Sequence, residues 1–252
     1  MHRPVAVVLS ILLASISPFA FADDPDPGYL FPGADLHIQT WLPPAPPRDS
    51  LQQAADVQTI FALRADVEGP RGVEAHQDDV YQPAEVAPRF DFILGIHLDP
   101  KTAPHTLQLL QRVTNDAEWL MRPIKRAVAD GGRQRPFVDY PSLHTCAIAY
   151  ERLPKTGSYP SGHASLGWLW GNILAELAPA HADALLARGI AFGDSRVVCG
   201  FHYPTDIAAG RLAASALLER LHADKRFQRD LDDARAEVAK LMRNANAANE
   251  RR

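Results

Sequence analysis

The chain has 252 residues, 46% of them hydrophobic, with a formal net charge of −4 and a sequence pI near 6.2. This acidic balance argues against a general binder of nucleic acids or of anionic membranes, because such proteins need a basic surface. An anionic ligand must therefore be captured by a local group of cations.

The first 22 residues have the pattern of a secretory signal peptide. His2 and Arg3 give a positive start, residues 5–16 are mostly apolar, and residues 20–22 form an Ala-Phe-Ala cleavage site. The alternative is a membrane anchor, but residues 5–16 are too few to span a bilayer. We therefore expect a periplasmic or secreted protein in which residues 23–252 form a single domain, with no membrane segment after signal removal.

Proline recurs through residues 23–48, which predicts an extended arm before the first helix. Three large apolar side chains in this stretch need burial, namely Phe31, Trp41 and Leu42. We therefore expect the arm to pack against the protein.

Apolar residues recur at spacings of three and four through several later segments, which predicts α-helices. Asp49 or Ser50 can cap the first helix, and Pro123 is expected to break or kink the second. Residues 68–79 predict a polar loop, and residues 135–150 an irregular segment. The expected helices cover residues 50–66, 104–129, 162–177, 182–193, 205–222 and 226–246.

The fold class predicted from these patterns is all-α. No run alternates apolar and polar residues over more than a few positions, and β-branched residues are sparse after residue 150. The last helix has one apolar stripe, which either packs on the chain's own core or forms a dimer, and we favour the first. The stripe consists of Phe227, Leu231, Ala234, Val238 and Leu241.

The sequence contains two cysteines, Cys146 and Cys199. In an exported chain a disulfide between them is the default, because such bonds persist outside the cytoplasm. The alternative is two separate buried thiols. A disulfide would tie the segment after Arg135 to the segment after Arg196.

Ser161, Gly162 and His163 stand where an extended segment turns into a predicted helix. The serine hydroxyl and the amides at a helix N-terminus form a ready site for an anion. His163, in the first turn, could give a proton to a leaving-group oxygen. Taken alone, the same residues could be a capping serine and a surface histidine.

A second cluster contains Arg196, His202 and Asp206. Positions four apart share one side of a helix or turn, so Asp206 can accept a hydrogen bond from one imidazole nitrogen of His202. The other nitrogen would be free to attack phosphorus or to take a proton. A purely structural hydrogen bond is the alternative.

Arg135 and Pro136 form the third element. The guanidinium offers a bidentate fork to phosphate oxygens. An Arg-Pro pair alone says little, and its value comes from preceding the other two clusters.

Together, Arg135-Pro136, residues 160–163 and the cluster of Arg196, His202 and Asp206 resemble the three-part signature of the type 2 phosphatidic acid phosphatase superfamily. More closely, the chain is similar to the bacterial class A non-specific acid phosphatases. This resemblance rests on the signal peptide, Tyr29-Leu30-Phe-Pro-Gly, residues 42–50, Arg135-Pro-Phe, residues 157–163 and residues 195–202.

The resemblance implies a compact helical bundle like those of these phosphatases and the vanadium haloperoxidases. It implies that His202 is a nucleophile forming a phosphohistidine, that Asp206 orients it, and that His163 protonates the leaving alcohol and then activates water. It further implies soluble phosphomonoester substrates, no metal or other cofactor, and a homo-oligomer. The oxygens of the phosphoryl group would be held by Arg135, Arg196, Ser161 and Gly162.

The chain departs from the family pattern at one position. The family has a lysine seven residues before the arginine of Arg-Pro, where this sequence has Val128. Lys125 lies ten residues before Arg135, and an insertion at residues 129–132 would restore its place. Arg126, seven residues before Arg133, is the alternative, and we prefer Lys125.

Two other function classes compete with a phosphatase. Vanadium haloperoxidases share the same signature, and vanadate mimics phosphate, so a vanadate-dependent haloperoxidase is the alternative enzyme. A non-catalytic anion-binding protein would bind phosphate without turnover. Lipid phosphatases of the superfamily usually have several membrane spans, which this sequence lacks after residue 22.

Overall fold

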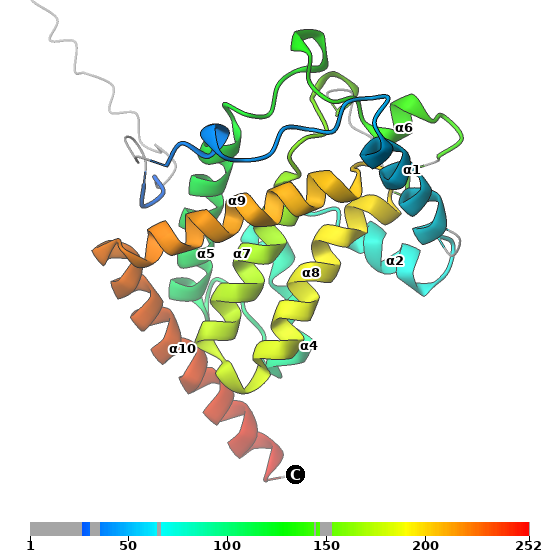
Figure 1. Cartoon of the computed structure of the whole chain (residues 1–252). Coiled ribbons are helices and arrows are strands. Elements are labelled where there is room, and N and C mark those ends of the chain that lie inside the picture. Colours follow the sequence, from blue (N-terminus) through cyan, green and yellow to red (C-terminus); the bar gives the residue numbers. More distant parts are fainter. Residues whose placement is uncertain (1–26, 31–35, 65–66, 144, 147–152, 252) are drawn as a thin grey trace, which may run out of the picture.

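The computed structural model describes residues 27–30, 36–64, 67–143, 145–146 and 153–251 (Figure 1). The expected signal peptide and Phe31 lie outside these residues. Within them every regular element is a helix, and strand pairing is limited to one isolated bridge, so the all-α prediction is confirmed. The α-helices are α1 (Leu51–Leu63), α2 (Pro70–Gln77), α3 (Pro83–Val86), α4 (Pro88–Leu94), α5 (Pro104–Met121), α6 (Pro136–Asp139), α7 (Gly162–Leu177), α8 (Ala182–Val198), α9 (Pro204–His222) and α10 (Lys225–Asn249).

Helix α7 lies at the centre of the bundle and packs against α8, α9, α5 and α10 (Figure 1). It approaches α8 closely because glycines face each other across the contact. A Cβ atom added at Gly171 would lie 3.2 Å from the Cα of Gly189. Close packing of these two helices fixes the N-terminus of α7 beside the C-terminus of α8, where the candidate site lies.

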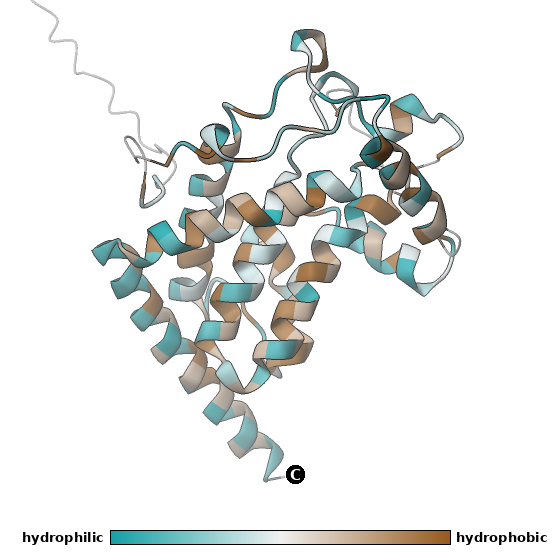
Figure 2. Ribbon diagram, viewed as in Figure 1, coloured by the Kyte–Doolittle hydropathy of each residue, from teal (hydrophilic) through white to brown (hydrophobic). Residues whose placement is uncertain are grey.

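The last helix packs on the chain's own core, as predicted. Phe227, Ala234 and Val238 are fully buried, and α10 lies against α5, α7 and α9. Figure 2 shows hydrophobic and hydrophilic residues alternating along this helix, as expected of an amphipathic helix.

The prediction of a loop at residues 68–79 is wrong, because α2 occupies most of this segment. Gly69 is the N-cap of this helix and Pro70 its first residue. Proline suits that position, since its missing N–H would have no partner inside the helix and its φ is already helical. The polar composition of the segment concealed this start signal.

Further boundaries differ from the prediction, and α5 ends at Met121, just before the break expected at Pro123. Helix α8 does not end at Gly193 but continues to Val198, so Arg196 is helical. A glycine inside α8 is explained by close packing, because a Cβ atom added at Gly193 would lie only 3.1 Å from the Cα of Ala164, on α7. Residues 135–150, predicted as irregular, begin with the short helix α6.

The proline-rich arm runs beside α9, with a pocket between them, and does not bury all its large side chains (Figure 1). Ile38 and Leu42, four residues apart, face inward with 0% and 8% exposure, whereas Trp41 between them is 43% exposed. The expected burial of Trp41 is therefore wrong, because the turn Ile38–Thr40 directs it to the other side. Tyr159 fixes the arm by donating its hydroxyl to the Pro43 carbonyl.

Cys146 and Cys199 form the predicted disulfide, with their Cα atoms 4.8 Å apart. The bond joins the segment after α6 to the turn between α8 and α9. None of the described helices is both long and apolar enough to cross a membrane.

Candidate active site

A cavity of about 590 Å3 opens where the N-terminus of α7 meets the C-terminal ends of α5 and α8. Six of the eight predicted catalytic and phosphate-binding residues line it, and the other two, Ser161 and Asp206, are buried behind it. The six are Lys125, Arg135, Gly162, His163, Arg196 and His202. Among the described residues, four cations line the cavity (Lys125, Arg122, Arg135 and Arg196) against three carboxylates (Asp79, Glu85 and Glu118), so positive charge is in excess there although the protein is acidic overall.

Ser161 is the N-cap of α7. Its hydroxyl accepts the Ala164 N–H at 3.3 Å, and its own N–H donates to the Asp206 carbonyl at 3.0 Å. The cap leaves Gly162 and His163, in the first turn, on the cavity wall. The partial positive charge of a helix N-terminus is therefore directed toward the cavity. A phosphate contact by the Ser161 hydroxyl stays a prediction.

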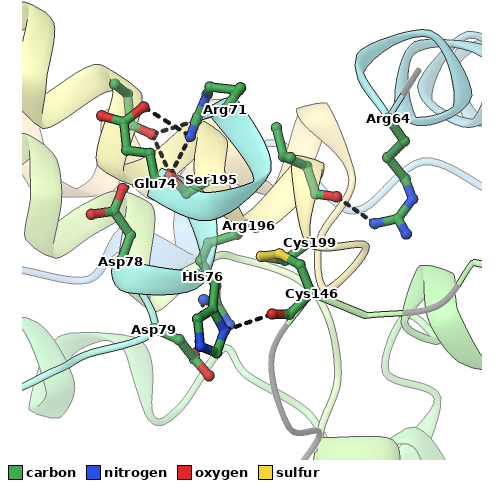
Figure 3. The surroundings of a disulfide bond; sticks show 12 residues. Arg64, Arg71, Glu74, His76, Asp78, Asp79, Cys146, Ser195, Arg196 and Cys199 are labelled. Carbon is green, nitrogen blue, oxygen red and sulfur yellow. Dashed lines mark hydrogen bonds and ion pairs between the residues drawn. A yellow bond between two sulfur atoms is a disulfide. The ribbon is translucent and has the colours of Figure 1, made fainter. Parts of the chain in front are cut away.

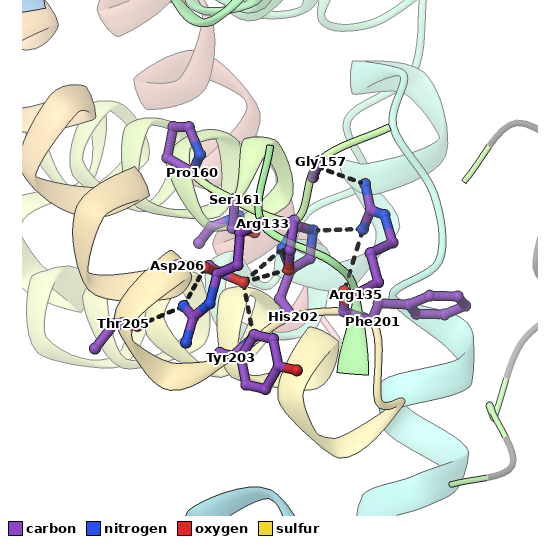
Figure 4. Close-up of polar contacts among 12 residues, drawn as sticks. Arg133, Arg135, Gly157, Pro160, Ser161, Phe201, His202, Tyr203, Thr205 and Asp206 are labelled. Carbon is purple, nitrogen blue, oxygen red and sulfur yellow. Dashed lines mark hydrogen bonds and ion pairs between the residues drawn. The ribbon is translucent and has the colours of Figure 1, made fainter. Parts of the chain in front are cut away.

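His202 lies in the turn between α8 and α9, which reverses at Gly200 with a φ of 75°. Its Nδ1 is 3.5 Å from Oδ2 of Asp206 and 3.4 Å from Oγ of Ser158, and its Nε2 is 3.2 Å from Nη1 of Arg135 (Figure 4). The predicted pairing of His202 and Asp206 is therefore present. The carboxylate faces one ring nitrogen, and the other nitrogen lies among the cations.

The surroundings of this pair control its protonation. Burial, reinforced by the charge of Arg135, lowers the pKa of His202 to about 3. Burial alone would raise the pKa of Asp206, but its hydrogen bond with His202 and the charge of Arg133 lower it to about 2. A neutral imidazole beside an ionised carboxylate is the state that a nucleophilic histidine needs at mildly acidic and neutral pH.

Arg135 is 2% exposed and precedes the short helix α6. Its guanidinium donates to the carbonyls of Leu153 at 3.0 Å, Thr156 at 3.2 Å and Phe201 at 3.1 Å. Burial lowers its pKa to about 10, so it stays charged at neutral pH. These bonds fix the cation beside Nε2 of His202.

The structure separates the two candidates for the family lysine. Lys125 lines the cavity and donates from Nζ to the Pro160 carbonyl at 2.9 Å. Arg126 is exposed and borders a different pocket, beside the proline-rich arm. Burial and the charge of Arg135 lower the pKa of Lys125 to about 7. Its charge therefore depends on pH in the range where the other cations stay charged.

Arg196, in the last turn of α8, is held against the cavity by an acidic partner. Its Nη1 lies 2.9 Å from Oδ1 of Asp79 (Figure 3). Its guanidinium carbon is 4.4 Å from the ring centre of Phe201. The neighbouring Asp78 is fully buried and accepts the Ser195 hydroxyl at 2.6 Å. The segment after α2 is thus anchored to α8, and it brings Asp79 into the cavity wall.

His163 presents a polar atom to the cavity. Its Nε2 is buried and has no hydrogen-bond partner among the described residues. Its ring stacks on Phe192 at 5.9 Å and meets Tyr81 edge-on at 5.0 Å, which fixes its plane. Burial and the charge of Arg196 lower the pKa of His163 well below its usual value. This histidine is therefore neutral at neutral pH.

Sequence reasoning missed three residues that contact Asp206 or its partner arginine. Ser158 donates its hydroxyl to Oδ2 of Asp206, and Arg133 donates to Oδ1 at 2.6 Å. Asp56, on α1, accepts from Arg133 at 2.6 Å. The signal available for Arg133 was its place two residues before Arg135. Nothing in the sequence around Asp56 marks it, because its partners lie far away along the chain.

Comparisons with known proteins identify the family of the chain. A family model described as the PAP2 superfamily matches residues 113–227. An acid phosphatase of Zymomonas mobilis subsp. mobilis is 37% identical over 240 residues, covering 95% of this chain and 89% of that protein. The chain belongs to the bacterial non-specific acid phosphatases of the PAP2 superfamily.

Two further relatives of this family have similar coverage. A non-specific acid phosphatase of Providencia stuartii is 34% identical over 220 residues, covering 87% of this chain and 88% of that protein. One of Salmonella typhimurium is 33% identical over 209 residues, covering 82% of each chain. The residues matched by the PAP2 model contain all eight predicted catalytic and phosphate-binding residues, whereas Asp79 and Tyr81 precede them.

Proposed function

We propose that this PAP2 protein hydrolyses soluble phosphomonoesters to an alcohol and inorganic phosphate through a phosphohistidine at His202, without a metal or other cofactor. The observation that supports this most directly is the placement of His202. Its Nδ1 faces the Asp206 carboxylate at 3.5 Å, and its Nε2 lies beside Arg135 at the cavity. Phosphoryl transfer needs positioning and positive charge more than further covalent chemistry.

In the first step Nε2 of His202 attacks phosphorus, and the bond between phosphorus and the ester oxygen breaks. The leaving oxygen takes a proton from His163 and departs as the alcohol, while Asp206 holds the Nδ1 proton. In the second step His163 takes a proton from water, the water oxygen attacks phosphorus, and the bond from phosphorus to Nε2 breaks. Arg135, Arg196, Lys125 and the amides at Gly162 stabilise the transferred group in both steps. Replacing water by another alcohol in the second step gives phosphotransfer.

The proton on His163 must arrive with the substrate. Burial and the charge of Arg196 hold the pKa of His163 well below its usual value, so its ring carries no extra proton at neutral pH. A phosphomonoester has a second pKa of about 6, and its monoanion brings one proton. Transfer of this proton to His163 within the complex gives the required acid. This route favours acidic conditions.

We further propose a periplasmic or secreted homo-oligomer, each subunit being one domain formed by residues 23–252. The signal-like residues 1–22 and the disulfide support export. Cell fractionation and N-terminal sequencing of the mature protein test the location and the cleavage site. Light scattering of the purified protein tests the oligomeric state.

The test of the reaction is hydrolysis of para-nitrophenyl phosphate from pH 4 to 8 with a chelator present. We expect turnover by the wild type and none by His202→Ala, together with an acid-labile phosphoenzyme in the wild type alone. His222→Ala is the matched control, because His222 also faces a carboxylate, Glu176 at 3.1 Å, but does not line the cavity. Chelator-sensitive turnover, or halide oxidation with added vanadate and no hydrolysis, would contradict the proposal.

A further inference from the structure

Arg133 lies between two buried carboxylates. Its Nη1 is 2.6 Å from Oδ1 of Asp206, and its Nη2 is 2.6 Å from Oδ2 of Asp56. The three side chains are 6%, 0% and 1% exposed, respectively. The guanidinium also lies over the ring of Tyr203, with its central carbon 3.9 Å from the ring centre. Such a geometry fixes both the position and the charge of the arginine.

The arrangement connects α1 to the first turn of α9. Asp56 belongs to α1, and it also accepts the backbone N–H of Thr205 at 3.3 Å. Arg133 itself donates to the Thr205 hydroxyl at 2.7 Å. Asp206 is thus held on the side opposite His202 by a cation whose charge is shared with a second carboxylate.

We infer that Arg133 and Asp56 are positioning residues for the reaction, which set the orientation and ionisation of Asp206 behind His202. The inference rests on the proposed function, because it assigns these residues a role in the proposed phosphoryl transfer. Neither residue lines the cavity. Arg133 keeps Asp206 ionised. Asp56 pairs with the other side of Arg133, so that the arginine does not fully neutralise Asp206. The carboxylate of Asp206 therefore still acts on His202 as an anion.

Several charged groups determine the ionisation of Asp206. His202 and Arg133 contact it, Lys125 and Arg135 face it from the cavity side, and Asp56 lies behind Arg133. Without Arg133, two buried carboxylates would face each other and Asp206 would take up a proton more readily. A protonated Asp206 no longer selects the Nδ1–H tautomer of His202, so Nε2 loses its free electron pair. Without Asp56, the whole charge of Arg133 acts on Asp206 and favours its ionised form.

The experiment compares Arg133→Gln with Asp56→Asn, which break the same contact from opposite ends. For Arg133→Gln we expect kcat to fall by about tenfold or more at pH 5, KM to stay within about threefold, and the acid limb of the kcat profile to rise by about one pH unit. For Asp56→Asn we expect a smaller fall in kcat and no rise of the acid limb of its pH profile. Arg133→Lys, which keeps the charge but not the fork, should recover part of kcat.

Arg211→Gln is the control, because Arg211 also ties α9 to another helix, through Asp194 at 2.6 Å, and does not line the cavity. Its profile should match the wild type. Equal losses of kcat in Arg133→Gln and Asp56→Asn that follow their thermal stability, with no change of profile, would overturn the inference. If Arg133→Gln does not fold, Arg133→Lys decides through kcat: a fall at pH 5 with KM within about threefold supports the inference, because an ammonium cannot reproduce the fork between Asp206 and Asp56, and an unchanged kcat overturns it.

A second measurement does not need turnover. The 15N NMR signals of His202 report its tautomer, and we expect the Nδ1–H form to persist to lower pH in the wild type than in Arg133→Gln. The same tautomer pattern in both proteins would overturn the inference. A wild type that lacks phosphatase activity but shows the expected shift would contradict only the proposed function.

Discussion

Asp79 and Arg196 form an ion pair at 2.9 Å inside the wall of the cavity, so a cation expected to hold phosphate already has an anionic partner. An incoming phosphate must share this guanidinium with the carboxylate. The pair fixes the position of the Arg196 guanidinium in the cavity wall. It also places a negative charge next to the position of a negatively charged ligand.

Asp79→Asn should therefore tighten the binding of inorganic phosphate. We expect the inhibition constant of phosphate to fall by roughly tenfold, because charges a few ångströms apart in a partly buried site interact by more than 1 kcal/mol. The measurement is competitive inhibition at pH 6. Glu85→Gln is the control, since Glu85 lines the same cavity but is exposed, whereas Asp79 is paired with Arg196. Weaker phosphate binding in Asp79→Asn would mean that the carboxylate chiefly orients Arg196.

The charge of Lys125 predicts a pH dependence of anion binding. Its pKa is lowered to about 7, so the ammonium is present below this pH and is lost as the pH rises through it. Sulfate suits the measurement because it does not itself titrate in this range. We expect its inhibition constant to rise as the pH increases from 6 to 8. In Lys125→Arg the rise should be much smaller, because arginine stays charged.

Substitution by methionine distinguishes the role of Lys125 from that of its neighbour Arg126. Lys125→Met should lower kcat/KM by about a hundredfold, the scale of losing one donor to the developing charge. Arg126→Met should change it by less than about threefold, because Arg126 is exposed and borders another pocket. Equal effects of the two substitutions would contradict the assignment of Lys125 to the phosphate site.

The sequence predicted the parts of this site that depend on local spacing. His202 and Asp206 are four residues apart, and Ser161 precedes an apolar helix, so their geometry follows from helix periodicity and capping. The sequence favoured Lys125 over Arg126 only by postulating an insertion, because the choice depends on how the chain turns after Pro123. That turn, and not the number of residues before Arg135, brings its ammonium to the Pro160 carbonyl.

The missed residues depend on contacts between distant parts of the chain. Asp56 meets Arg133 only because α1 packs beside the start of α9, and a lone aspartate in a mixed helix carries no sign of this. The same limit explains the fold errors. The start of α2 was a local signal that polar composition obscured, whereas the continuation of α8 through Gly193 depends on its contact with α7.

The role of His163 as the acid predicts a dependence on the leaving group. An alkyl phosphate expels a strongly basic alkoxide and needs a proton, whereas para-nitrophenyl phosphate expels a stable phenolate. His163→Ala should therefore lower kcat for glycerol phosphate by about a thousandfold. For para-nitrophenyl phosphate the fall in kcat should be smaller by a factor of at least about ten. An equal loss with both substrates would indicate that His163 binds the phosphoryl group and does not deliver the proton.

The disulfide predicts a loss of stability that is separate from catalysis. Cys199 is three residues before His202, and the bond closes a loop with a sequence separation of 53. The entropy of such a loop corresponds to about 4 kcal/mol of stabilisation. Replacing both cysteines by serine should lower Tm by roughly 10 °C. At 25 °C kcat should stay within about threefold of the wild type, because Arg135 and Asp206 still hold the ring of His202. A large loss of kcat at 25 °C in a fully folded variant would instead show that the turn carrying His202 needs the covalent bond to keep its nucleophile in place.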